Sequence, residues 1–141
     1  MTNSSPQTDS VELNPGNTNT NTDGTTGPYN SLIVGDNSVP GPGPYGTIVS
    51  NIHIHALGDT QEGMVRLFFK ENGGAAWRLI REIPIPLNAS DNQTPCFSQT
   101  INISDVFLAP QDALAVTSTT TDFFAVSAFG YKLISFSECC C

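Results

Sequence analysis

The stretch MVRLFFKENGGAAWRLIREIPI at residues 64–85 decides the fold class. In its first half Val65, Leu67 and Phe69 alternate with the basic side chains of the opposite face, which is the period of a half-buried β-strand. NGG at 72–74 supplies a turn, because Asn and Gly tolerate positive φ. The second half is a return strand. The stretch therefore predicts an antiparallel β-hairpin, whose second strand we expect to end at the prolines 84 and 86.

The same alternation recurs on both sides of this hairpin. Further strands are predicted at TIVSNIHIHAL (47–57), CFSQTINI (96–103), ALAVTSTT (113–120) and DFFAVSAFGYKLISF (122–136). Gly130 is expected to split the last of these or to mark a bulge, and residues 104–112 are expected to form a corner turn. Seven or eight strands after residue 46, with no helix, predict an all-β antiparallel β-sandwich or jelly roll.

Residues 1–46 differ in composition, with NTNTNTDGTTG at 17–27 and VPGPGPYG at 39–46. Such a segment buries too little apolar surface to fold alone, and a disordered tail is the simplest interpretation. We favour an extended arm that becomes ordered on a neighbouring subunit, with residues 32–34 adding a strand there. The predicted domains are thus an arm (1–46), a β-sandwich (47–136) and a cysteine-rich tail (137–141).

The charge balance restricts the partners. The formal net charge is −8, and charged residues make up 13% of the chain, about half the usual share. An acidic chain repels the phosphate backbone, so we expect no nucleic acid. No run of about 18 apolar residues is present, so we expect no membrane span. Expected inter-subunit contacts are the apolar arm residues and a local basic set: Val11, Leu13, Leu32, Ile33, Val34, Arg66, Lys70, Arg78 and Arg81.

Sequence motifs give no support for catalysis. The chain lacks G-x-S-x-G, H-E-x-x-H and P-loop patterns. His53 and His55 lie on one strand face and can chelate a metal, but no third ligand is evident, and zinc sites usually need three or four. Trp77 is expected to pack in the core or at an edge rather than to stack on a ligand. We expect no enzyme activity, no cofactor and no metal.

Four cysteines stand apart from this pattern. Cys96 precedes a strand, and Cys139, Cys140 and Cys141 follow one another in a spacing that fits no zinc finger. Three interpretations stay open, namely a reduced inert terminus, disulfides to a neighbour or to Cys96, and binding of a soft metal.

Residues 61–85, QEGMVRLFFKENGGAAWRLIREIPI, resemble a segment of small structural proteins of tailed bacteriophages, and ALAVTSTTTDFFAVSAFGYKL resembles the close of the same domain. The resemblance covers about residues 46–133 and leaves out the first 45 residues and the SECCC end. It implies a virion component made in the host cytoplasm. Within that class we expect a capsid decoration (cement) protein on the outer capsid surface. It would bind the major capsid protein and copies of itself, as a homotrimer.

Rival hypotheses remain at this point. The arm and the cysteines also suit a filament subunit that polymerises by arm insertion and disulfides, and a tail or fibre component of the virion is a second rival. A carbohydrate-binding sandwich is a third, although a single Trp and the lack of an aromatic platform argue against it. An enzyme comes last.

Overall fold

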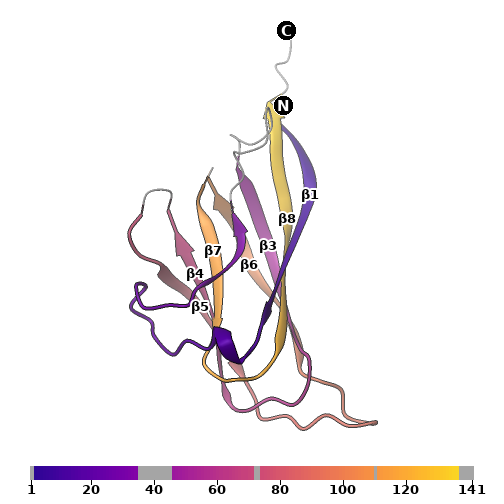
Figure 1. Cartoon of the computed structure of the whole chain (residues 1–141). Coiled ribbons are helices and arrows are strands. Elements are labelled where there is room, and N and C mark those ends of the chain that lie inside the picture. Colours follow the sequence, from indigo (N-terminus) through magenta and orange to yellow (C-terminus); the bar gives the residue numbers. More distant parts are fainter. Residues whose placement is uncertain (1, 35–45, 72–73, 110, 137–141) are drawn as a thin grey trace.

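The computed structural model describes residues 2–34, 46–71, 74–109 and 111–136, and it is all-β. Two four-stranded antiparallel sheets pack face to face as a β-sandwich (Figure 1). The strands are β1 (Thr2–Leu13), β2 (Asn30–Val34), β3 (Thr47–Ala56), β4 (Gly63–Lys70), β5 (Arg78–Ile85), β6 (Ser98–Leu108), β7 (Ala113–Ser118) and β8 (Phe124–Phe136). A 3-10 turn at Pro15–Asn17 follows β1.

The strands pair from the outside of the sequence inward. β1 pairs with β8, β2 with β7, β3 with β6, and β4 with β5. Two further pairings, β3 with β8 and β4 with β7, join these ribbons into sheet A, in the order β1-β8-β3-β6, and sheet B, in the order β2-β7-β4-β5. The start of β1, the start of β3 and the end of β8 consequently lie at one end of the sandwich, called here the upper end (Figure 1).

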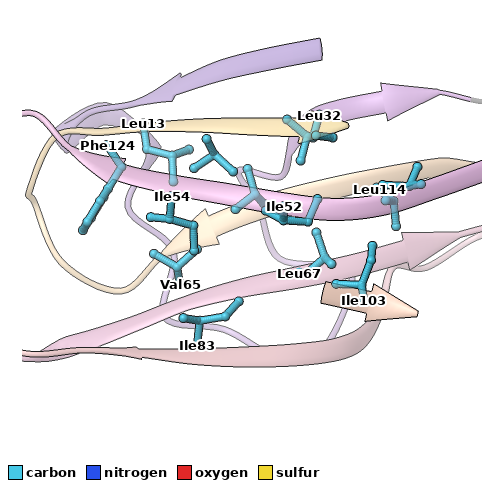
Figure 2. Packing of buried hydrophobic residues seen from close by; sticks show 14 of the residues in the cluster. Leu13, Leu32, Ile52, Ile54, Val65, Leu67, Ile83, Ile103, Leu114 and Phe124 are labelled. Carbon is cyan, nitrogen blue, oxygen red and sulfur yellow. The ribbon is translucent and has the colours of Figure 1, made fainter. Parts of the chain in front are cut away.

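The core lies between the sheets and is built from the inward positions of the alternating strands. Figure 2 shows apolar side chains of β3, β6 and β8 in sheet A meeting those of β4, β5 and β7 in sheet B. The N-terminal segment contributes to this cluster, because Leu13 and Leu32 are buried in it. Burial of such a side chain stabilises the fold by about 1.5–3 kcal/mol.

The division expected at residue 46 is not seen in the described residues. β1 and β2, both from the segment expected to be an arm, complete the two sheets of the same chain. The strand count of eight is reached only with them, since six strands follow residue 46. Composition misled here because β1 is an edge strand and needs few apolar residues: Val11 and Leu13 suffice to anchor it.

Two expectations about bulges and strand ends are confirmed, and one boundary differs. β8 is continuous through Gly130, and Gly130 lies at a bulge, because the β3–β8 register shifts between the pairs Val49–Gly130 and Asn51–Phe129 with the extra residue in β3. β5 ends at Ile85, directly before Pro86, as expected, and it includes Pro84 because an edge strand tolerates a missing N–H. β6 extends to Leu108 across the expected corner turn, with positive φ at two of its residues.

Candidate interaction surfaces

The two histidines lie on the outer face of sheet A. His53 Nδ1 is 2.8 Å from Thr100 Oγ1, and the rings of His53 and His55 stack with centroids 6.4 Å apart. In the described part of the chain no group of three or more His, Cys, Asp or Glu side chains converges. We therefore searched the two outer sheet faces for binding surfaces.

The outer face of sheet B is covered by the chain itself. Phe68 on β4 points away from the core, yet it is fully buried. Tyr29 packs edge-on against it, with ring centroids 5.0 Å apart, and Tyr29 also stacks on Trp77 at 5.7 Å. These contacts belong to residues 14–29, called here the covering loop, which joins β1 to β2 and lies beside β7 and β4 (Figure 1).

Hydrogen bonds of a buried asparagine hold the covering loop in shape. Asn19 Nδ2 donates to the carbonyl oxygens of Thr26 and Pro28 at 3.0 and 2.9 Å, and Asn19 Oδ1 accepts the N–H of Asn21 at 2.9 Å. The Asn19 N–H donates to the carbonyl of Ser118 on β7. A buried side chain with its polar atoms satisfied in this way fixes one conformation, so the polar NTNTNTDGTTG segment is a folded element.

A tight turn docks the same loop on Trp77. Asp23 Oδ1 accepts the N–H groups of Thr25 and Thr26 at 3.1 and 2.9 Å. The Thr26 hydroxyl also donates to Asp23 Oδ2. This hydrogen bond contributes most, and the two N–H groups add to it, so that the pKa of Asp23 is lowered to about 2. Gly24, at φ +81°, accepts the N–H of Trp77 at its carbonyl, and a Cβ there would lie 2.0 Å from the Trp77 carbonyl oxygen.

Two basic residues expected to contact a neighbour are engaged within the chain. Arg66 Nε lies 3.0 Å from Glu82 Oε2, and Arg66 Nη1 donates to the carbonyl of Thr20 in the covering loop. The ammonium group of Lys70 lies over the Trp77 ring, 5.4 Å from its centroid. Both therefore help to hold the loop on sheet B.

The two remaining basic residues lie on the edge strand β5 and are exposed. Arg78 forms an exposed ion pair with Glu71 at 3.2 Å and lies over the ring of Phe69. Arg81 Nη2 donates to the carbonyl of Asn102 on β6, which ties the two sheets together at this edge. Exposed ion pairs contribute at most about 1 kcal/mol, so Arg78 stays available to a partner.

The apolar arm residues have different locations from those expected. Leu13 and Leu32 are buried in this chain's core, so these two are not accessible to a neighbour in this fold, and Val11 is partly buried against the core. Ile33 and Val34 pair through their backbones with β7. Their side chains lie outside the described part.

The outer face of sheet A, in contrast, carries uncovered aromatic side chains. Cross-strand pairing aligns Phe107 on β6 with Ile48 on β3, Ile48 with Tyr131 on β8, and Tyr131 with Pro6 on β1. Phe129 lies two residues from Tyr131 on the same face. Phe107, Tyr131 and Phe129 are 52%, 49% and 40% exposed. We call these five residues the aromatic patch.

A hollow lies within the aromatic patch. Its volume is about 240 Å³, and its lining is formed by Pro6, Thr8, Ser50, Asn51, Phe129, Gly130 and Tyr131. Gly130 makes the close approach of β8 to β3 possible, because a Cβ there would lie 1.9 Å from the Ile48 carbonyl oxygen. The extra residue of the β3 irregularity, Ser50, contributes to the same wall.

The opposite, lower end of the sandwich carries three exposed apolar side chains, namely Leu57, Leu87 and Phe123. They belong to the connections that follow β3, β5 and β7, and the Leu57 N–H donates to the Phe123 carbonyl. This end has one exposed aromatic ring where the aromatic patch has three, so it is the weaker candidate.

Cys96 lies at the lower end of the sandwich. It is half-buried and free, and Phe97 beside it is hydrogen-bonded to Ala56, level with the start of β8. The three terminal cysteines lie outside the described residues, so the expected disulfides stay a prediction.

No protein-family model matches the chain, and no curated protein shows significant sequence similarity to it. In the described part of the chain, no helix has the length and apolar character needed to cross a bilayer.

The sequence analysis did not single out the aromatic patch or Tyr29. Phe129 and Tyr131 occupy positions of β8 that alternate with buried Val126 and Ala128, so aromatic residues stand at outward positions. Aromatic residues at positions that alternation predicts to face outward are the feature of the sequence that could have indicated this surface. The outward position of Phe107 could not be predicted, because residues 104–112 were expected to form a turn.

Proposed function

We propose that this chain is a non-enzymatic structural protein of a bacteriophage virion, of the capsid decoration type, which binds the outer surface of the shell. The observation that carries an assembly role is the aromatic patch. Three half-exposed aromatic rings on one sheet face are the kind of surface that protein interfaces bury. The proposed partners are the major capsid protein and further copies of the chain.

Strand topology supports the structural class. We assign the orders β1-β8-β3-β6 and β2-β7-β4-β5 to a jelly roll, since an eight-stranded ribbon folded as two Greek keys pairs first with last, second with seventh, third with sixth and fourth with fifth. Viral capsid proteins are among the users of this architecture, together with lectins and cupins. The similarity of residues 61–85 to tailed-phage structural proteins points to the virion within this group.

The side of the molecule that faces the shell is proposed to be the β5 edge. β5 presents exposed Arg78 and Arg81, and Ile80 between them is 40% exposed. In a chain with a net charge of −8, this is where a complementary acidic surface binds with least repulsion. The aromatic patch then remains free for copies of the chain.

Co-sedimentation with purified capsids of the encoding phage tests this proposal. We expect stoichiometric binding to assembled shells and none to free capsid subunits. The double variant Arg78→Glu and Arg81→Glu should lose binding, whereas Leu87→Ala, at the lower end, should retain it. Absence of binding to shells under low-salt conditions would refute the decoration role.

A second candidate function, a filament subunit, is favoured by the position of the cysteines. Cys96 lies at the lower end, β8 ends at the upper end, and three cysteines follow β8 in the sequence, which suits disulfide bonds between successive subunits. Electron microscopy of the purified chain, oxidised and then reduced, distinguishes the two functions. Long fibres that dissociate in reductant favour the filament, and discrete particles favour decoration.

A further inference from the structure

We infer that the aromatic patch binds a second copy of this chain, so that two molecules pair face to face through sheet A about a two-fold axis parallel to the strands. This inference rests on the proposed assembly role and names the partner of one surface. It differs from the homotrimer expected from the phage resemblance.

The first support is that the outer face of sheet A carries both a projecting side chain and a hollow large enough to hold it. Phe107 projects from β6 and is 52% exposed. The hollow of about 240 Å³ lies over β8, with further lining residues from β1 and β3, and Pro6 forms its wall on the β1 side. A cavity of about 150 Å³ is enough for a benzene ring, so the hollow accommodates a phenyl side chain.

The second support is that a two-fold axis places the projecting Phe107 of each copy against the hollow of the other copy. The axis runs between the faces, midway between β3 and β8, and exchanges β6 of one copy with β1 of the other at the same height. Phe107 of each copy then lies opposite Pro6 of the other, and Ile48 lies opposite Tyr131. Because the row Phe107–Ile48–Tyr131–Pro6 is continuous across the sheet, the contact is isologous.

The third support is charge. Two copies with a net charge of −8 repel each other, so their contact needs a surface with few charges. β3 has no charged residue, and no member of the aromatic patch is charged. Glu12 on β1 and Asp105 on β6 are exposed. The axis places each of them opposite a strand of the other copy that has no acid at that height, namely Ser98 and Thr8.

The size of the face is sufficient for a stable pair. Four strands about 4.8 Å apart and ten residues long cover roughly 600 Å² per copy. The pair therefore buries on the order of 1,200 Å², the lower limit for specific protein complexes. Sheets pack in this manner at about 10 Å separation inside sandwich proteins.

Sedimentation velocity of the full chain in reductant, over a range of concentrations, tests the inference. We expect a reversible dimer. Phe107→Ala should raise the dissociation constant at least about tenfold, because it removes the ring that enters the hollow of the other copy. Leu87→Ala, an exposed apolar residue at the other end, should leave the constant unchanged. A monomer up to the millimolar range, a trimer, or a dimer insensitive to Phe107→Ala would overturn it.

A mixing experiment tests the mutual insertion. Phe129→Ala removes one wall of the hollow, so it should weaken the dimer as Phe107→Ala does. A one-to-one mixture of the two variants restores one intact contact, because Phe107 of one copy meets the hollow of the other. The mixture should dimerise more tightly than either variant, and equal affinity would refute the insertion. A monomer that still binds shells would overturn the dimer and leave the proposed function standing.

Discussion

The outer faces of both sheets carry apolar side chains, but they differ in whether the chain covers these side chains. Sheet B places Phe68 on its outer face, and the covering loop buries it with Tyr29 and Asn19 holding the loop in place. Sheet A places Phe107, Phe129 and Tyr131 on its outer face, and no described segment of the chain covers them. The difference teaches that the chain can cover an apolar sheet face when stability requires it. The dimer inferred above would cover the exposed face of sheet A in a corresponding way.

Truncation of one phenylalanine on each face gives the largest expected contrast. Phe68→Ala removes a fully buried ring and should lower the free energy of unfolding by about 3–5 kcal/mol. Phe129→Ala removes a ring that water already reaches, and it should cost less than about 1 kcal/mol. Urea denaturation at the lowest practical concentration, where dimerisation adds nothing, measures both. Equal losses would mean that the two faces are not different in burial.

A methyl group added to the covering loop gives the next largest effect. Gly24→Ala combines a positive φ with a contact 2.0 Å from the Trp77 carbonyl oxygen, so it should destabilise the chain by about 1–3 kcal/mol and displace the loop. Gly58→Ala is the matched control, since no atom lies within 4 Å of its Cβ. Fluorescence of Trp77, the only tryptophan, reports on the loop. An unchanged spectrum and unfolding midpoint for Gly24→Ala would contradict this docking.

Acid should loosen the covering loop by a smaller amount. The folded-state pKa of Asp23 is lowered to about 2 from 3.8, so its contribution to stability is present above pH 4 and is lost as the pH falls toward 2. We expect the Trp77 fluorescence to change over this window, and Asp23→Asn to weaken that change. Asp91→Asn is the control, because the pKa of Asp91 is also lowered, by the N–H groups of Gln93 and Thr94, in a different loop. A change of equal size in both variants would show that Trp77 does not report on Asp23.

The sequence predicts the all-β class and the hairpin of β4 and β5 because alternation and turn residues are local signals. It does not predict the assignment of β1 and β2 to the two sheets, because their partners lie about 100 residues away. The covering loop was missed for a related reason. Its order depends on the carbonyl groups around Asn19 and on Tyr29 meeting Phe68, which are contacts that composition does not encode.

The candidate surfaces were predicted less well than the fold. The basic residues were predicted correctly to lie on neighbouring strands. Arg66, however, donates to the covering loop, and Lys70 lies over Trp77, on which Tyr29 of that loop stacks. Leu13 and Leu32 are buried in the core of the same chain. The aromatic patch exists only after four strands are placed side by side, since its members come from positions 6, 48, 107, 129 and 131.

The pairing of the first strand with the last also governs how the chain reaches this structure. Ser10 and Ser127, whose hydroxyl oxygens lie 2.9 Å apart, are separated by 117 positions. During synthesis β1 emerges more than 100 residues before β8, its neighbour in the described sheet A, so β1 is unpaired for that interval. Folds of such high contact order form on the millisecond-to-second scale. The polar, proline-containing sequence of β1, which looked like a tail, keeps this waiting strand from pairing with the wrong molecule.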